Sequence, residues 1–181
     1  MLRQLNRSAI GIELLNLIPL DTEFDWAGWV SPGTMAQPYG HAVHVPRGFD
    51  PANSLDQVNV SLLGHELVHV LQRVNNRPGM CDNCTVLYSE MEGYIVQYAI
   101  EYDLAPDANA RGTARAKLQA VAVSQADAYR WLESFGGLTG VVYRLADETY
   151  VYGSGDWHDT LSELGFSNLA TQHIDWILAN P

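Results

Sequence analysis

The sequence predicts an α+β fold, because segments with a strand pattern come early in the chain and segments with a helix pattern dominate the later part. The chain has 181 residues, a length typical of one domain. Apolar residues make up 47% of it and aromatic residues 10%, which is enough to build a packed core. This composition excludes a chain that is disordered throughout.

The early part of the chain is expected to hold one short helix and two strands. Residues 8–18 have the pattern of a helix that is ended by a proline. Residues 22–30 carry Phe24 and Trp26 at alternate positions, which predicts a strand with an aromatic inner face. Residues 39–45 precede another proline and predict a second strand.

Helices account for most of the remaining chain. The longest helical pattern covers residues 55–76 and is followed by Arg77-Pro78-Gly79, which ends the helix. Further elements are predicted in this order: helices at 86–104 and 113–135, an extended segment at 141–152, and short helices at 157–164 and 168–178. The chain is therefore expected to combine a small sheet with a helical C-terminal half.

The chain is strongly acidic. It has 10 basic and 21 acidic residues and a net charge of −11, so a nucleic-acid partner is not expected. No stretch stays apolar over the 18 or so residues that a membrane span needs. Glu13 and Asn16 interrupt the apolar stretch near the N-terminus, so we expect a soluble protein with neither a signal peptide nor a membrane span.

The chemistry of the chain is expected in the helix at 55–76, which contains the pattern H-E-x-x-H. His65 and His69 are four residues apart, so on a helix both imidazoles lie on one face and reach a single ion. Glu66 lies between them and can take a proton from a water molecule at that ion. This combination suits zinc-dependent hydrolysis, with one zinc ion per chain as the cofactor.

A catalytic zinc site usually has three protein ligands, so one more ligand is expected from another element. The next helix carries Glu90 and Glu92, which lie about 200° apart around the helix axis, so only one of them can face the metal. Tyr94 shares the face of Glu90 and is a candidate hydrogen-bond donor to the oxyanion of the reaction. The residue pattern alone leaves the choice between the two glutamates open.

Two further places contain candidate site residues. His158 lies in a glycine-rich turn between carboxylates that can orient its ring, and it is a second candidate oxyanion donor. The strand at 39–45 can pair with an extended peptide at the edge of a sheet, with His41, Val43 and His44 as substrate-binding residues. The two histidines of this strand point to opposite faces, so only one of them can enter the cleft.

Cys81 and Cys84 form a single C-x-x-C pattern after the first long helix. A structural zinc site needs about four ligands, so this pair alone does not define one. A local disulfide, two free thiols and a contribution to a closed metal site all remain open.

The segment from His65 to Gln72, H-E-L-V-H-V-L-Q, resembles the signature of the gluzincin metallopeptidases. More narrowly, it is similar to the small HExxH domain, with a trailing glutamine, of toxins and effectors of bacterial contractile injection systems. Residues 35–45 resemble the stretch that precedes the metal helix in that family. The next helix of the family carries an E-x-E-A-D-type stretch, and residues 90–94 read E-M-E-G-Y at that place.

The resemblance implies a zincin-like fold and makes Glu90 the third zinc ligand, with Glu92 as the fallback. A single zincin-like domain then covers residues 1–181, with the metal-site core at about 34–104 and a helical part at about 105–181. The resemblance also implies a bacterial, toxin- or effector-like hydrolase, either cytoplasmic or exported as an effector.

The function expected from these residues is that of a zinc metallopeptidase acting on a peptide or protein substrate. His65, His69 and Glu90 hold the zinc in this prediction, and Glu66 acts as the general base. Two alternatives stand beside it: a catalytically silent binding or regulatory module, and a closed structural zinc domain. The intact Glu66 favours the enzyme, because a closed structural site does not need that carboxylate.

Overall fold

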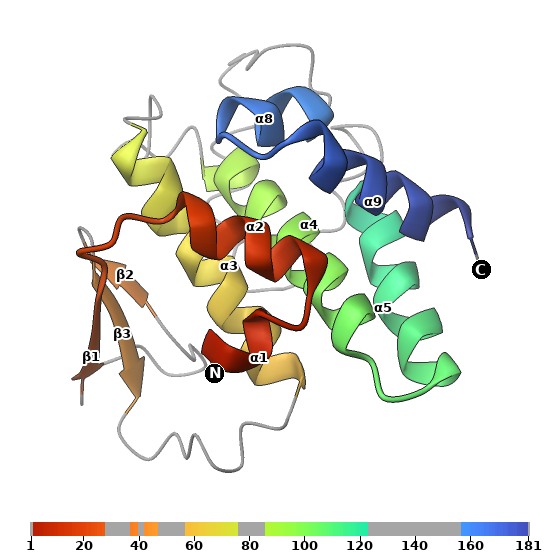
Figure 1. Ribbon diagram of the computed structural model, residues 1–181, viewed down its shortest axis with the longest axis horizontal. Coiled ribbons are helices and arrows are strands. Elements are labelled where there is room, and N and C mark those ends of the chain that lie inside the picture. The colour runs from red at the N-terminus through yellow and green to blue at the C-terminus, as the bar shows by residue number, and fades with distance from the viewer. Residues whose placement is uncertain are drawn as a thin grey trace.

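The computed structural model describes residues 2–27, 37–39, 42–46, 57–75, 86–122 and 157–180. Two long helices form its centre, α3 (Gln57–Val74) and α4 (Val86–Leu104), and they lie side by side (Figure 1). The helices predicted at 55–76 and 86–104 are thereby confirmed. Neither of them, nor any other described helix, is long and apolar enough to cross a membrane.

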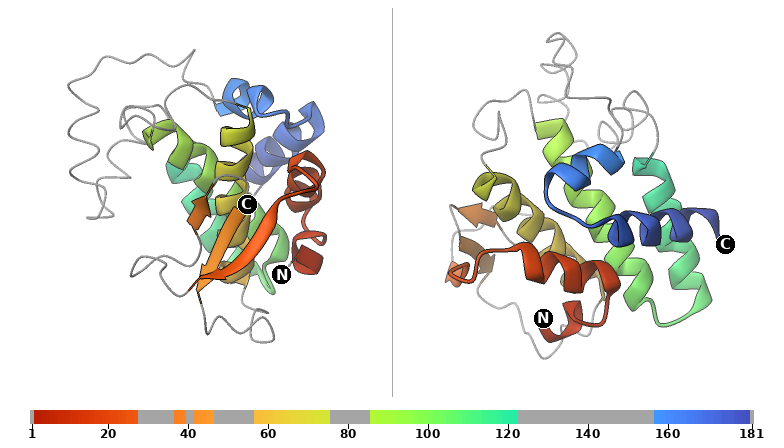
Figure 2. Two further views of the ribbon diagram at one scale, coloured as in Figure 1. Left: turned by 90° about the vertical axis from the view of Figure 1, so that its left-hand side faces the viewer. Right: turned by 45° about the horizontal axis from the view of Figure 1, so that its top comes forward.

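Five further helices pack around this pair. They are α1 (Leu2–Leu5), α2 (Ala9–Leu17), α5 (Ala108–Val121), α8 (Trp157–Glu163) and α9 (Asn168–Ala179). The helices α1 and α2 cross one side of the pair, α5 runs along α4, and α9 bridges α2 and α5 (Figures 1 and 2). Their apolar side chains form one core with those of the central pair, including Leu5, Leu14, Leu67, Ile95, Leu118 and Ile174.

A small sheet lies beside α3. It consists of β1 (Glu23–Ala27), β2 (Gln37–Tyr39) and β3 (Ala42–Pro46) in the order β1-β3-β2. The central strand β3 is parallel to β1 and antiparallel to β2. Among the described side chains of these strands, only Val43 belongs to the buried core.

The expected α+β, zincin-like fold class is wrong for the described residues, which are mostly helical. The three strands are short, and the core is built almost entirely between helices. The prediction gave the sheet too much weight because it assigned the first strand a buried aromatic face. Phe24 is instead 38% exposed, and the side chain of Trp26 is outside the described part of the chain.

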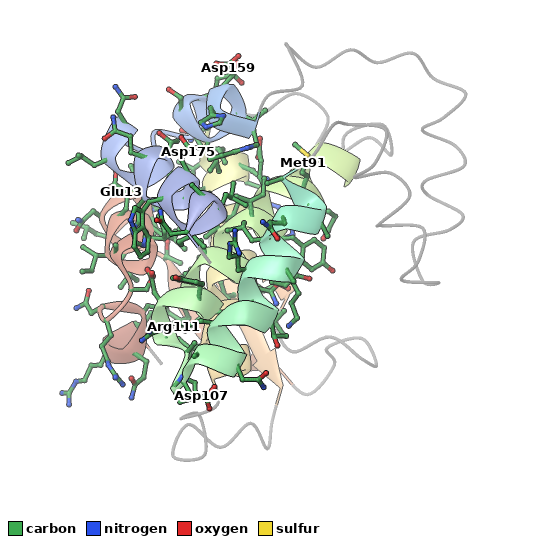
Figure 3. The ribbon with its side chains drawn as sticks, turned by 90° about the vertical axis from the view of Figure 1, so that its right-hand side faces the viewer. Glu13, Met91, Asp107, Arg111, Asp159 and Asp175 are labelled. Carbon is green, nitrogen blue, oxygen red and sulfur yellow. The ribbon has the colours of Figure 1, made fainter. Side chains whose placement is uncertain are left out.

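Two element boundaries also differ from the prediction. The strand predicted at 39–45 is two strands, since the register pairs Tyr39 with Ala42. The helix predicted at 113–135 begins earlier, because the side chain of Asp107 accepts a hydrogen bond of 2.8 Å from the backbone N–H of Ala110 and caps α5 (Figure 3).

The late part of the chain is described only in pieces. The short helices predicted at 157–164 and 168–178 are confirmed by α8 and α9. The end of the helix predicted at 113–135 and the extended segment predicted at 141–152 lie outside the described residues.

Polar contacts of the Asp103 side chain connect three helices. Its carboxylate on α4 accepts hydrogen bonds from the Ser8 hydroxyl at 2.7 Å and the Ala9 backbone N–H at 2.9 Å, at the start of α2. The same carboxylate lies 2.8 Å from the Nε2 atom of His173 on α9. His173 therefore has the structural role that its place in an apolar helix suggests.

The His173–Asp103 pair is expected to stabilise the protein more at low pH than at high pH. The hydrogen bond to Asp103 raises the pKa of His173 above its ordinary value of 6.5, although burial opposes this. The stabilisation is full below pH 6.5 and is lost as the pH rises through the higher folded-state pKa. His173→Gln should cost about 1 kcal/mol more in the free energy of unfolding at pH 5.5 than at pH 8.5. Urea unfolding of both proteins at the two pH values measures this difference, and an equal cost at both would contradict it.

Candidate metal centre

Helices α3 and α4 lie side by side (Figure 1), and both histidines of the H-E-x-x-H segment on α3 contact Glu90 of α4. The Nε2 atoms of His65 and His69 lie 3.0 Å apart, and the two rings meet edge to face. Both side chains are buried, as is Glu66 between them. The prediction that the two rings share one helix face is confirmed. In the described part of the chain, α4 packs against this face.

Helix α4 adds a carboxylate to the two rings. One oxygen of Glu90 lies 3.2 Å from the Nε2 atom of His65, and the other lies 3.5 Å from the Nε2 atom of His69. The ligand atoms of these three residues all lie within 4.8 Å of one another. The carboxylate beside the histidines is therefore Glu90. The fallback residue, Glu92, is buried beside Gln72 instead, 2.6 Å from its Nε2 atom.

The spacing of the three groups fits a tetrahedral zinc ion. Ligand atoms about 2.0–2.1 Å from such an ion stand about 3.3 Å from one another. The two Nε2 atoms stand 3.0 Å apart, and each lies near a different oxygen of Glu90, at 3.2 Å for His65 and 3.5 Å for His69. Two imidazole nitrogens and a carboxylate are also ligands that zinc commonly takes in proteins. The donor set and its spacing thus suit one zinc ion.

Hydrogen bonding fixes the position of one proton on His69. The Oε1 atom of Gln72 lies 2.8 Å from Nδ1 of His69, while the amide group of Gln72 donates to Glu92. Gln72 Oε1 can only accept, so Nδ1 of His69 carries the proton and donates it. The Nε2 atom of His69 then faces Nε2 of His65 and the carboxylate of Glu90, and a further proton or a metal ion can lie between them.

The charges of the metal-free cluster show which of these groups holds that proton. Burial lowers the pKa of His65. Burial also opposes protonation of His69, but hydrogen bonding to Glu90 and the charges of Glu90 and Glu66 outweigh it and raise the pKa of His69 to about 9. The same hydrogen bonds from the two histidines outweigh the effect of burial on Glu90 and hold its pKa well below its ordinary range. Metal binding at this site therefore replaces a proton.

Glu66 is buried beside the cluster, and its surroundings favour the protonated form. Burial raises the pKa of Glu66 to about 7, while the charge of His69 opposes the rise and that of Glu90 adds to it. A carboxyl group whose pKa lies near neutral pH both takes and returns a proton readily.

The ring of His65 is held between two neighbours on α4. Tyr94 meets it edge to face, with ring centroids 4.5 Å apart. Gly93 is the second neighbour. A Cβ atom added to it would lie 2.8–2.9 Å from three atoms of the same ring. The glycine at this position therefore leaves room for the histidine. Burial raises the pKa of Tyr94 to about 12, so its hydroxyl stays protonated.

We expect Gly93→Ala to displace the His65 ring and to destabilise the protein by about 1–3 kcal/mol. The added methyl group has no space unless the ring moves away from Glu90, so zinc affinity should fall as well. The matched control is Gly112→Ala on α5, where nothing lies within 4 Å of the added atom. That change should be neutral or stabilising by up to about 1 kcal/mol. Urea unfolding and chelator competition measure both effects, and equal behaviour of the two variants would contradict the prediction.

His158 lies at the junction of α8 and α9. Its Nε2 atom is 2.9 Å from an oxygen of Asp175 on α9, and its ring stacks on Trp157. Figure 3 shows Asp175 on the side of α9 that faces α8. These contacts give His158 a structural partner, and the metal cluster of the described residues does not include it.

The predicted substrate strand is not a free edge. Val43 is fully buried, and β3 pairs with a neighbour on each side, so its backbone cannot bind a peptide. This corrects the substrate-binding role expected for Val43 and for the backbone at His44. The side chain of His44 lies outside the described residues, as do His41 and the Cys81–Cys84 pair.

The residue pattern assigned no role to the buried polar residues around the site. Gln97 and Glu101 are buried on α4, and Ser61 of α3 donates to Glu101. Glu90, Gln97 and Glu101 recur at spacings that place them along one side of a helix, and this pattern was the available signal.

Comparison with known proteins adds no further assignment, because no family model, no curated protein and no solved structure matches this chain.

Proposed function

We propose that the protein is a zinc-dependent metallopeptidase. The observation that carries the proposal is the convergence of His65, His69 and Glu90, whose ligand atoms lie within 4.8 Å of one another beside a buried Glu66. The three converging residues hold the zinc. A zinc ion in such a site acidifies a water molecule and polarises a substrate carbonyl group.

Glu66 is the general base in this proposal. It would take a proton from the attacking water and return it to the leaving amine. Glu66 adjoins His65 in the chain and is not one of the converging ligand atoms, so it could act on a water molecule rather than bind the ion. His65, His69 and Glu90 would hold the ion, and three protein ligands are the usual number in a catalytic zinc site.

A peptide bond is the proposed target because the H-E-x-x-H segment and Glu90 resemble those of gluzincin metallopeptidases. The hydroxyl of Tyr94 is the proposed donor to the oxyanion. Tyr94 is part of the site by virtue of its contact with the ring of His65.

The test is cleavage of a broad peptide library by the zinc-loaded protein, by the metal-stripped protein and by Glu66→Gln. We expect cleavage by the first sample alone, and restored cleavage when zinc is returned to the second. Zinc binding without cleavage of any peptide would favour a binding module or a structural zinc domain and would overturn the proposal.

A further inference from the structure

Each histidine of the metal centre can be matched with a buried glutamine of the chain. For His69 this residue is Gln72, whose Oε1 atom lies 2.8 Å from Nδ1. The amide nitrogen of Gln72 in turn donates to Glu92 at 2.6 Å, which fixes the orientation of the amide. The His69 ring is therefore held with its proton on Nδ1 and with Nε2 free for a metal.

The corresponding residue for His65 is Gln97. The Nδ1 atom of His65 and the Oε1 atom of Gln97 are both buried, and neither has a hydrogen-bond partner among the described residues. The donor of one and the acceptor of the other complement each other.

Gln97 is held in place as Gln72 is, by a buried glutamate of α4. Its Nε2 atom donates to Glu101 at 3.3 Å, so its Oε1 atom is the end left for the histidine. Glu101 is only 3% exposed and also binds Ser61 of α3 at 3.2 Å. Its other oxygen pairs at 2.9 Å with Lys117 of α5, the only lysine of the chain.

Burying a carboxylate costs free energy unless the group is fully paired, and the stability of the core alone does not require a carboxylate here. Two such glutamates are present, and each accepts a hydrogen bond from one of the two glutamines. We infer that the two pairs have the same role at the two histidines. In metal sites, the hydrogen bond at the second ring nitrogen fixes the tautomer and orientation of each histidine ligand.

We propose that Gln72 and Gln97 are positioning residues of the metal centre, each holding one histidine at Nδ1 and each anchored by a glutamate of α4, Glu92 or Glu101. This inference rests on the zinc-binding part of the proposed function. It does not depend on the reaction. Lys117 pairs with Glu101 and so connects α5 to the second of these pairs. The geometry of His65 then depends on three helices, α3, α4 and α5.

The first test is zinc affinity, measured by chelator competition on the full chain. Gln72→Met and Gln97→Met remove the acceptor but keep a side chain of similar length, and each should weaken zinc binding about 10–100-fold. The matched control is Gln172→Met, at an exposed position of α9, which should leave the affinity unchanged. Affinities of both buried variants within twofold of the wild type would overturn the inference.

The second test uses nitrogen-15 NMR of the histidine rings and needs only folded wild-type protein to begin. In the zinc-loaded wild type, both rings should carry a slowly exchanging proton on Nδ1 and bind zinc through Nε2. In each variant, only the histidine next to the lost glutamine should exchange that proton faster, which a general loss of packing would not produce. Zinc on either Nδ1 atom would overturn the inference. A wild type that binds no zinc would overturn the proposed function too, whereas tight zinc binding with unchanged variants overturns this inference alone.

Discussion

Replacing either His65 or His69 by alanine should remove tight zinc binding from the protein. Each ring supplies one of three converging ligand atoms, and the remaining two cannot complete a zinc site. The loss should exceed about a hundredfold in affinity, since even outer hydrogen-bonding partners of zinc ligands contribute 10–100-fold. Metal analysis after dialysis, with chelator competition on the purified variants, measures the effect.

The matched control for these variants is His158→Ala. His158 is a partly exposed histidine whose described partners are Asp175 and Trp157. Its removal should leave the zinc content at about one ion per chain. Full zinc content in His65→Ala or His69→Ala, or zinc loss in the control, would contradict the site described above.

Glu66→Gln should lower peptide turnover by roughly two to four orders of magnitude, the usual scale for loss of a general base. The amide keeps the shape of the side chain but cannot take the proton of the attacking water. Zinc affinity should stay within a few fold of the wild type, because Glu66 is not one of the converging ligands. Steady-state cleavage of the best library peptide, with zinc content measured on the same sample, separates the two effects.

Glu23→Gln, at an exposed position of β1, is the control for this change and should keep full activity. An active Glu66→Gln enzyme with normal zinc content would show that another group removes the proton. That result would leave the metal site intact and would refute the role of Glu66.

The sequence predicted the helix of the metal motif well because its signals are local. The spacing of His65 and His69 fixes their common face, and prolines and glycines end the pattern after residue 74. The start of α5 was missed even though Asp107 is a strong cap with a clear local signal.

The choice between Glu90 and Glu92 depends on contacts between helices, and local pattern does not contain them. Helix α4 is surrounded by other helices, so apolar residues occur all around it and polarity indicates no face. The resemblance favoured Glu90, and the structure shows that carboxylate beside both histidines. The role of Glu92 becomes clear only from the position of Gln72 on the neighbouring helix.

The fold class failed for a similar reason. The early part of the chain does contain strands, but the number of strand patterns does not indicate how many core side chains a sheet supplies. Of the described strand side chains, Val43 alone reaches the buried core, whereas α3 and α4 supply its centre. Packing between distant helices decided the class, and a reading of local periodicity gives little information about it.

A crystal structure of the zinc-loaded protein tests the central claim most directly. The zinc ion should lie about 2.0–2.2 Å from the Nε2 atoms of His65 and His69 and from a carboxylate oxygen of Glu90. Glu92 should remain bonded to Gln72. Zinc bound by Glu92, or by a thiolate of Cys81 or Cys84 in place of Glu90, would contradict the account.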